Sequence, residues 1–140
     1  MSGHAFHEIY LHFNWHVEEN RQIITPEMES LIYEKILNRC RAIPGFYPEG
    51  VGGTETHVHL AGNIEPTVLI SDTIGKIKGG SSHDVNETLG YKYLDWRRGY
   101  GVVSFSKRDL PWVLAYIANQ KEHHQRGTEN PKLEIYDFLE

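Results

Sequence analysis

The sequence has few of the features that mark secreted, disulfide-bonded or membrane-spanning proteins. Cys40 is its only cysteine, so no internal disulfide can form, which is typical of proteins in a reducing compartment. No stretch approaches the roughly 18 consecutive apolar residues of a membrane-spanning helix. Residues 1–7 lack the basic start and apolar block of a secretory signal. We therefore expect a cytoplasmic protein that does not enter a membrane.

A surplus of basic charge is also missing. The formal net charge is -5 at pH 7, with 14 Lys and Arg against 19 Asp and Glu. Because proteins bind nucleic-acid phosphates largely through Lys and Arg, this balance argues against a simple nucleic-acid-binding protein. The charges are unevenly spread, however, since seven basic and only three acidic residues lie from Lys76 to Arg108. A locally basic surface is therefore compatible with the sequence, as is an ordinary solvated face.

The chain does contain enough apolar material for one folded unit. It has 140 residues, of which 39% are hydrophobic and 11% aromatic. This length suits one domain with a sizeable core and is short for two. Because the sequence shows no internal repeat and no linker-like segment, we predict a single domain over residues 1–140.

Hydrophobic spacing predicts a strand, a helix and a hairpin in the first half of the chain. Residues 7–17 alternate between apolar and mainly polar side chains, which is the period of a half-buried strand. Its polar face could carry ligand contacts or meet water, and we favour water. Thr25-Pro26 begins a helix to about Arg41, since threonine is a good N-cap and proline suits the first helical position. Residues 46–51 form a second strand, and Gly52-Gly53 is the turn to a third.

The second half of the chain predicts two further helices and one further strand. A helix from about residue 68 ends near Gly79-Gly80, and residues 100–105 form the fourth strand. Ser106 to Asp109 resembles a capping box that opens the last helix, and the tail from Glu129 is an appended helix or arm. This order predicts an α+β fold, a ferredoxin-like antiparallel sheet with helices packed on one face and an extra C-terminal helix.

Two histidines on the third predicted strand suggest a metal site. In Thr56-His57-Val58-His59-Leu60 the histidines are two residues apart, and side chains alternate between the two faces of a strand. Both imidazoles therefore point the same way and can bind one ion. A His-x-His pair also occurs as the polar face of a half-buried strand, so the motif needs a second one to support it.

The last predicted helix supplies that second motif. Tyr116 and Gln120 are four residues apart, which places both on one side of a helix. With His123 they lie at the edge of the apolar stripe that packs on the sheet. A side chain there can reach a site on the sheet, although an amphipathic tyrosine at a core margin has the same spacing. Together the two motifs indicate a site that cuts phosphodiesters, with a third metal ligand beside the tyrosine. Gln120 could be that ligand, or His123 or His124 could take its place.

Four groups of residues occur in order along the chain. They are His57-Val58-His59-Leu60; Lys76 and Lys78-Gly79 with Ser81-Ser82; Trp96 with Gly99-Tyr100-Gly101; and Tyr116-Ile117 with Asn119-Gln120 and His123-His124. Together they resemble the single-tyrosine transposases of small bacterial insertion sequences, which are His-hydrophobic-His endonucleases and include the REP-associated tyrosine transposases. The resemblance covers nearly the whole chain in the right order, and the joint occurrence is far more specific than one motif.

The resemblance implies a fold, partners and a set of roles. It implies a ferredoxin-like domain, a homodimer, single-stranded DNA with hairpin structure as substrate, and a divalent metal as cofactor. His57 and His59 would be metal ligands and Gln120 the third ligand. The extra C-terminal helix would carry Tyr116 as the catalytic nucleophile.

The chemistry of these residue types agrees with such roles. A tyrosine hydroxyl has a pKa of about 10 in water and needs a nearby cation to attack a phosphate at neutral pH. Two imidazoles and an amide oxygen suit Mn²⁺ and tolerate Mg²⁺. Attack by Tyr116 would leave a 5′-phosphotyrosine and a free 3′-hydroxyl, so that the strand could be rejoined without ATP.

Several polar side chains between the two motifs are candidates for DNA contacts. The predicted phosphate-binding side chains are those of Lys76, Lys78, Arg97 and Arg98. The hydroxyls of Ser81 and Ser82 could also meet phosphates, or they could cap a short helical turn. Trp96 or Tyr100 could stack on bases, although core packing is the commoner role of such aromatics.

Two other functions stay open at this point. A catalytically inactive or domesticated protein that binds single-stranded nucleic acid would use the same sheet, but it has no need for Gln120 beside Tyr116. A metal-dependent phosphodiester hydrolase would use the same histidines with activated water in place of Tyr116. A hydrolase would keep its activity when Tyr116 is replaced by phenylalanine, whereas a tyrosine transposase would lose it.

Overall fold

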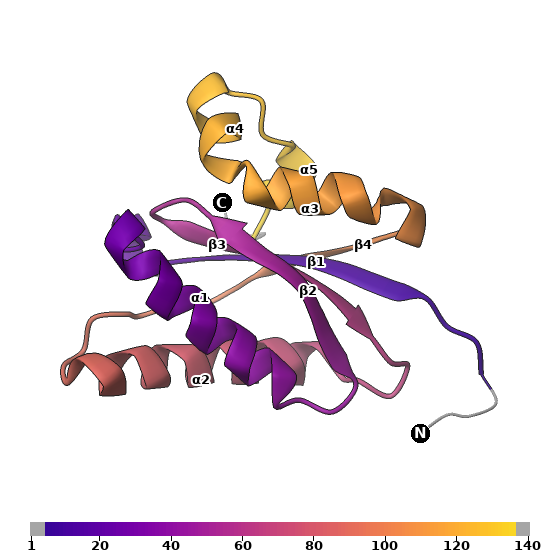
Figure 1. Cartoon of the computed structure of the whole chain (residues 1–140), viewed down its shortest axis with the longest axis horizontal. Coiled ribbons are helices and arrows are strands. Elements are labelled where there is room, and N and C mark those ends of the chain that lie inside the picture. The colour runs from indigo at the N-terminus through magenta and orange to yellow at the C-terminus, as the bar shows by residue number, and fades with distance from the viewer. Residues whose placement is uncertain (1–4, 137–140) are drawn as a thin grey trace.

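A four-stranded antiparallel sheet forms the centre of the protein, whose computed structural model describes residues 5–136 (Figure 1). The strands are β1 (Ile9–His16), β2 (Phe46–Gly53), β3 (His57–Ile64) and β4 (Gly101–Phe105). Their order in the sheet is β2-β3-β1-β4, so β3 and β1 are the central strands. The predicted ferredoxin-like α+β fold is confirmed, because a helix follows β1 and another follows β3.

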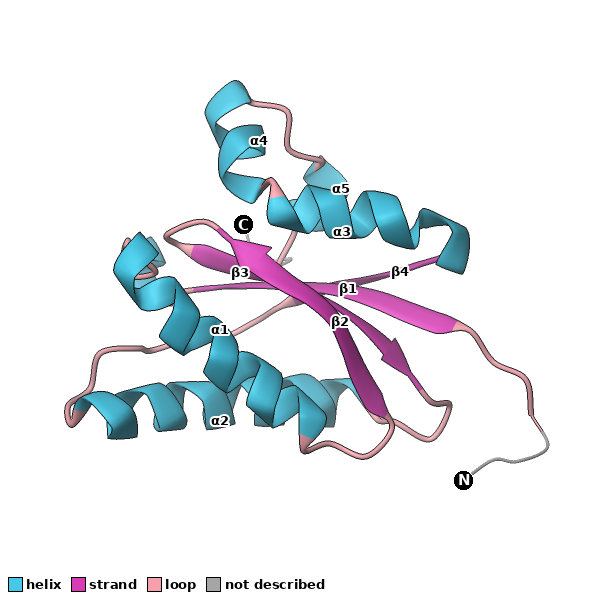
Figure 2. Cartoon of the chain, in the orientation of Figure 1, coloured by secondary structure: helices cyan, strands magenta, loops and turns pink. Residues whose placement is uncertain are grey.

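Helices cover both faces of this sheet (Figure 2). On one face lie the two helices that connect strands, α1 (Pro26–Arg41) and α2 (Ile70–Leu89). On the other face lie the C-terminal helices, α3 (Leu110–Ala118), α4 (Gln120–Arg126) and α5 (Pro131–Glu134). Two short 3-10 helices, η1 (Glu18–Asn20) and η2 (Lys107–Asp109), complete the described elements. No helix within residues 5–136 is long and apolar enough to span a membrane.

Strand β1 buries side chains on both faces because each face carries a layer of helices. Phe13 and Trp15 belong to the large core cluster that also contains side chains of α1 and α2. His12 and Asn14 point to the opposite face and are only 2% and 3% exposed. The prediction that the polar face of this strand meets water is therefore wrong, because the C-terminal segments cover it.

Helix α2 is longer than its sequence predicts. It continues through Gly79-Gly80 to Leu89, where Gly90 ends it with a φ of +83°. A Cβ at Gly80 would lie 2.5 Å from Cδ of Arg39, so this glycine lets α1 and α2 pack closely. Ser81 and Ser82 consequently lie inside the helix and do not cap a separate turn.

Strand β2 also extends beyond its predicted end. Gly52-Gly53 belongs to the strand, and residues 54–56 form the turn to β3. A Cβ at Gly52 would lie 2.6 Å from the carbonyl oxygen of Ile117, so glycine here allows α3 to pack directly on the hairpin. The glycines thus mark a close approach of two backbones, and the hairpin brings His57 beneath α3 and α4.

The last predicted helix is divided in two. Asn119, with φ -104° and ψ 25°, separates α3 from α4, so Tyr116 and Gln120 belong to different helices. The predicted capping box does not form, because Ser106 makes no side-chain bond to the backbone of the 3-10 turn that follows it. The break at Asn119 turns α4 toward the end of the sheet where β3 begins (Figure 1).

Candidate metal and nucleophile site

Strand β3 presents its two histidines on the sheet face beneath the C-terminal helices. His57 and His59 are 3% and 0% exposed, and their ring centroids lie 5.1 Å apart. Pairing with the central strand β1 fixes both positions, since His57 lies opposite His16 and His59 lies opposite Asn14. The two histidines predicted to bind one ion thus lie side by side on a central strand of the sheet.

Gln120, the first residue of α4, reaches the same place. Its side chain is fully buried, and its Oε1 lies 3.3 Å from Nε2 of His57 and 3.1 Å from Nε2 of His124. Its amide nitrogen has no hydrogen-bond partner within the described structure. The structure therefore brings the predicted ligands His57, His59 and Gln120 together, with the amide oxygen turned toward the imidazoles.

Glu134 and His124 complete this cluster. Oε1 of Glu134 lies 3.3 Å from Nε2 of His57, 3.3 Å from Nε2 of His59 and 3.4 Å from Nε2 of His124. One ligand atom from each of these four residues lies within 4.8 Å of the others. Two atoms that share an ion at about 2.1 Å, at right angles or slightly more, are about 3.0 to 3.4 Å apart. The three distances to Oε1 of Glu134 thus have the values expected between ligands of one ion.

The donor atoms also fit a divalent ion. Imidazole nitrogen, amide oxygen and carboxylate oxygen form a set that suits Mn²⁺ and is compatible with Mg²⁺. Burial by itself would raise the pKa of Glu134, but hydrogen bonds with His57 and His59 hold that pKa well below its usual range. The carboxylate is therefore an anion that faces three imidazoles.

Hydrogen bonds behind the cluster orient both strand histidines. Nδ1 of His59 lies 2.8 Å from Nε2 of His12, and Nδ1 of His57 lies 2.9 Å from Oγ1 of Thr54. Burial, together with the charge of His59, lowers the pKa of His12 to about 3, so His12 is neutral. Its Nε2 can therefore accept a hydrogen bond from Nδ1–H of His59. This arrangement leaves Nε2 of each strand histidine free to face the cluster.

Tyr116 lies directly beside the cluster and is almost completely enclosed. It is 3% exposed, and its ring stacks on that of Trp112 at 5.5 Å between centroids. Its hydroxyl donates to Oε2 of Glu134 and accepts from the backbone N–H of Asn130 at 2.8 Å. Burial and the bond to Glu134 raise the pKa of Tyr116 to about 12. In this conformation the phenol is protonated and held away from solvent.

The two histidines that follow Gln120 have different surroundings. His124 belongs to the cluster, and its Nδ1 lies 3.4 Å from Oε2 of Glu129. His123 packs its ring 4.8 Å from that of Tyr116, and its Nδ1 bonds Oγ1 of Thr128 at 3.0 Å. Of the two alternatives to Gln120, His124 is therefore the one whose nitrogen faces the cluster.

A cavity of about 530 Å³ opens beside the cluster and is lined by His57, His124 and Glu134. A stack of rings forms another part of its wall: His16 lies on His57 at 4.6 Å, and Tyr136 lies on His16 at 3.8 Å. The guanidinium of Arg97 lies over the Tyr136 ring at 5.4 Å. The stack thus connects the cluster with the loop that carries a predicted DNA-binding residue.

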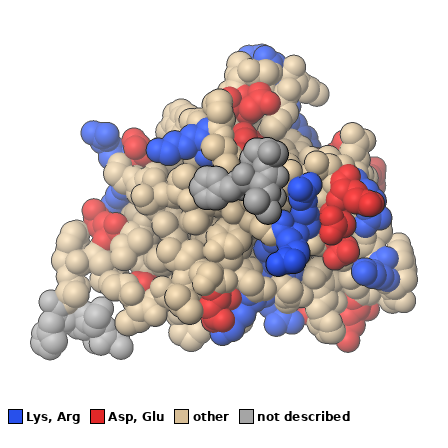
Figure 3. Space-filling view, turned by 180° about the vertical axis from the view of Figure 1, so that it is seen from behind, with Lys and Arg blue, Asp and Glu red and all other residues tan. Residues whose placement is uncertain are grey.

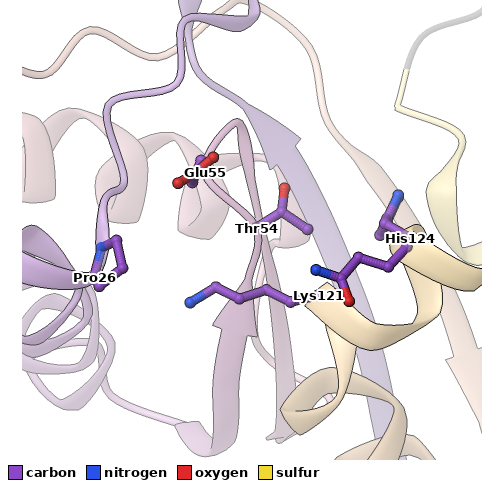
Figure 4. A pocket seen from close by; sticks show the side chains of 6 residues that line it. Pro26, Thr54, Glu55, Lys121 and His124 are labelled. Atoms are coloured by element: carbon purple, nitrogen blue, oxygen red, sulfur yellow. The ribbon is translucent and has the colours of Figure 1, made fainter.

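A second cavity, of about 360 Å³, is also lined by His124 (Figure 4). Pro26 at the start of α1, Thr54 in the hairpin turn and Lys121 on α4 line it. Lys121 forms an ion pair with Glu29. His124 is therefore a wall residue of both cavities.

The predicted DNA-binding residues have varied surroundings. Lys78 donates to the carbonyl oxygens of Arg97 and Gly99, both at 2.8 Å, so its ammonium supports that loop. Arg98 is exposed. Lys76 is also exposed and pairs with Asp72 at 3.1 Å. Basic and acidic side chains are interspersed on the face seen in Figure 3, and large areas of that face carry neither.

Ser81 is a core residue in this structure. It is 0% exposed, donates to the carbonyl oxygen of Lys78 and accepts from Nε1 of buried Trp96 at 3.1 Å. Ser82 bonds the carbonyl oxygens of Lys78 and Gly79 from the outer side of the helix. Tyr100 packs against the core cluster. The aromatic side chains thus have the packing role that the sequence favours.

Sequence reasoning missed Glu134 and His12. The tail from Glu129 is predicted only as a helix or arm, and β1 is assigned no site residue. One local signal exists in the tail: Asn130-Pro131 is an N-cap followed by proline, and the Asn130 side chain does accept from the N–H of Lys132. That signal predicts a short helix, but it does not predict where the helix packs.

The match to a known protein family identifies a transposase. Residues 5–120 match the family model of the IS200-like transposases, and the chain therefore belongs to that family. No curated protein gives a significant match to the chain. The matched residues end at Gln120, so α5 and Glu134 lie outside the matched region.

Solved structures that resemble the fold include the following two. A crystal structure from Deinococcus radiodurans R1, assigned as a transposase, is 18% identical, with a TM-score of 0.66, and the match covers 84% of this chain and 94% of that one. A REP-associated tyrosine transposase bound to a REP hairpin is 15% identical, with a TM-score of 0.61. That match covers 92% of this chain and 76% of the other. At these identities the likeness concerns the fold.

Proposed function

We propose that this protein cuts and rejoins single-stranded DNA beside hairpin structures through a covalent 5′-phosphotyrosine at Tyr116. A divalent ion, Mg²⁺ or Mn²⁺, would be held by His57, His59 and Gln120. The observation that carries the proposal is the convergence of Tyr116, His57 and His59 on one carboxylate, that of Glu134. The amide oxygen of Gln120 lies beside them, 3.3 Å from Nε2 of His57. A tyrosine placed there can attack a phosphate once a divalent ion is bound beside it and its hydroxyl has lost its proton.

The chain's own residues supply position and orientation. His12 and Thr54 hold the strand histidines with Nε2 toward the cluster, and α3 holds the Tyr116 hydroxyl beside them. When bound, the divalent ion would act as a Lewis acid toward the phosphate. Fixing the tyrosine there replaces a bimolecular encounter by a positioned one.

The proposed reaction exchanges one phosphoester bond for another. The Tyr116 oxygen loses its proton and bonds to phosphorus, while the bond to the 3′-oxygen breaks and that oxygen takes up a proton. The products are a 5′-phosphotyrosine and a 3′-hydroxyl, and attack by a 3′-hydroxyl reverses the step. Tyr116 must first exchange its contacts with Glu134 and Asn130 for the substrate.

Hairpin DNA is the proposed partner because the family cuts DNA and one structural neighbour is bound to a REP hairpin. Arg97, which lies at the end of the ring stack, and the exposed side chains of Arg98 and Lys76 are proposed phosphate contacts. A homodimer is also part of the proposal, because strand exchange joins two DNA ends and one copy holds one tyrosine at this site. Sedimentation that shows only monomers, with cleavage intact, would reject the dimer.

The deciding experiment mixes the protein with Mn²⁺ and a single-stranded hairpin DNA labelled at its 3′ end. A denaturing gel should show the label attached to protein, because the fragment downstream of the cut carries the phosphotyrosine. Tyr116→Phe should keep DNA binding and lose the adduct, since only one hydroxyl is removed. The matched control is Tyr91→Phe, at an exposed tyrosine, which should keep the adduct.

Two results would replace this proposal by another function. Cleavage by the Tyr116→Phe protein, with free 5′-phosphate ends and no attached protein, would identify water as the nucleophile and the protein as a hydrolase. Hairpin binding without cleavage in either Mn²⁺ or Mg²⁺ would identify a nucleic-acid-binding protein that has lost activity.

A further inference from the structure

The C-terminal segment places a carboxylate at the centre of the histidine cluster. The three imidazole nitrogens that surround Oε1 of Glu134 come from two secondary-structure elements: His57 and His59 from β3, and His124 from α4. The distances of 3.3, 3.3 and 3.4 Å are nearly equal, so the oxygen does not favour one partner. An ordinary surface ion pair has one partner, whereas this oxygen is shared evenly by three nitrogens at distances that also fit ligands of one ion.

The sheet holds this segment at the residues on both sides of Glu134. Nδ2 of Asn14 donates to the carbonyl oxygens of Leu133 at 3.0 Å and Ile135 at 2.9 Å. Leu133 is buried, and Gly101 leaves room for the Ile135 carbonyl, which would lie 1.8 Å from a Cβ at that position. A buried asparagine on β1 and a glycine on β4 thus fix the backbone that carries the carboxylate.

We infer that Glu134 is a ligand of the divalent ion, so that the C-terminal segment contributes an anionic oxygen to the set of His57, His59 and Gln120. This inference rests on the metal site of the proposed function. Hard divalent ions such as Mn²⁺ and Mg²⁺ prefer oxygen ligands, and the other three predicted ligands are neutral. A single carboxylate makes the set more selective for such ions.

The competing explanation is that Glu134 only pairs with protonated histidines. The two explanations predict opposite effects of removing the carboxylate. A ligand strengthens metal binding, so its loss weakens the affinity. A counter-ion competes with the metal for the imidazoles, so its loss leaves the affinity unchanged or raises it.

The test is calorimetric titration of Mn²⁺ into the full-length protein, supported by electron paramagnetic resonance of free Mn²⁺. Glu134→Gln and Glu134→Ala should each lower the affinity at least about tenfold. Glu129→Gln is the matched control, because Glu129 also faces His124 but through its other nitrogen, Nδ1, outside the cluster. It removes the same charge nearby and should change the affinity less than about twofold. Circular dichroism shows whether each variant is folded.

His57→Ala separates failure of this inference from failure of the proposed function. If His57→Ala loses Mn²⁺ binding while both Glu134 variants keep or improve it, Glu134 is a counter-ion and the metal site of the proposed function stands. If the unaltered protein binds no Mn²⁺, both fail. If Glu129→Gln weakens binding as much as Glu134→Gln, the effect is long-range charge and Glu134 is not a ligand.

Discussion

Replacing Gly101 by alanine should detach the C-terminal segment from the sheet. A Cβ at this position on β4 would lie 1.8 Å from the carbonyl oxygen of Ile135 and 2.7 Å from Nδ2 of Asn14. The glycine does not adopt the left-handed conformation, so alanine suits its backbone and the effect is purely steric. The contact is with a backbone oxygen, which has no side-chain rotation to relieve it.

The size of the effect follows from the two hydrogen bonds at this point. To stand about 3.0 Å from the new carbon, the carbonyl oxygen must retreat by about 1.2 Å, which close packing permits only if the segment moves. Such a movement would break the bonds from Asn14, now 2.9 and 3.0 Å long. At about 1 kcal/mol each, their loss lowers the free energy of unfolding by about 2 kcal/mol. Because Glu134 lies between Leu133 and Ile135, its side chain would move out of the cluster together with this segment.

Three measurements test this expectation. Urea unfolding should show the loss of stability, trypsin should cut after exposed Lys132, and Mn²⁺ affinity should fall as in Glu134→Ala. The matched control is Gly75→Ala on α2, where a Cβ meets nothing within 4 Å. Its stability should stay level or rise by up to about 1 kcal/mol, since alanine is the better helix former. Unchanged stability, trypsin resistance and Mn²⁺ affinity in Gly101→Ala would refute the reasoning.

Two further predictions concern buried polar groups. His12→Gln keeps an acceptor for Nδ1 of His59, whereas His12→Leu does not, so the leucine variant should lose about tenfold in Mn²⁺ affinity and the glutamine variant much less. An equal loss in both would show that His12 acts through packing alone. Burial raises the pKa of the Cys40 thiol to about 12, so iodoacetamide at pH 8 should label the protein only after unfolding in urea. Rapid labelling of the folded protein would contradict that burial.

Local patterns in the sequence predict the parts of the fold that depend on neighbouring residues. The period of two in β1 and the spacing of His57 and His59 depend only on the geometry of a strand, and both are correct. Thr25-Pro26 likewise predicts the start of α1. These signals identify an element and its faces, but they carry no information about what covers each face.

Glycine shows where such reasoning fails. Gly79-Gly80 predicts a helix end and Gly52-Gly53 a turn, yet the first pair lies inside α2 and the second forms the last two residues of β2. Gly80 admits the Arg39 side chain and Gly52 admits the Ile117 backbone, and both partners are distant in the sequence. A glycine that permits a turn and one that permits close packing look alike until the partner is known.

The candidate site was predictable only in part for the same reason. The strand histidines, Gln120 and Tyr116 belong to two short motifs, whereas Glu134 depends on a contact across the whole domain. Asn14 and Leu133, which place it, are 119 residues apart. No pattern in either segment encodes that pairing, so a ligand outside the motif could be found only from the structure.

Lys78 provides a prediction about pH that concerns the loop beside the site. Burial lowers the pKa of Lys78 from 10.5 to about 8. Between these two values the unfolded chain holds more protons than the folded protein, so stability should rise with pH across this window. The slope is at most about 1.4 kcal/mol per pH unit, and less here because water still reaches the side chain. Below pH 8 the contribution should be constant.

Lys78→Met removes this titration and also the two bonds to the carbonyl oxygens of Arg97 and Gly99. Urea unfolding at pH 8 and pH 10 should therefore show that the advantage of the unaltered protein over Lys78→Met grows with pH, because all other titrating groups are shared. Lys76→Met, at an exposed lysine on the same helix, is the matched control and should leave the slope unchanged. A constant difference between the unaltered protein and Lys78→Met would mean that the pKa of Lys78 is not lowered in the folded protein, because the two bonds to carbonyl oxygens offset its burial.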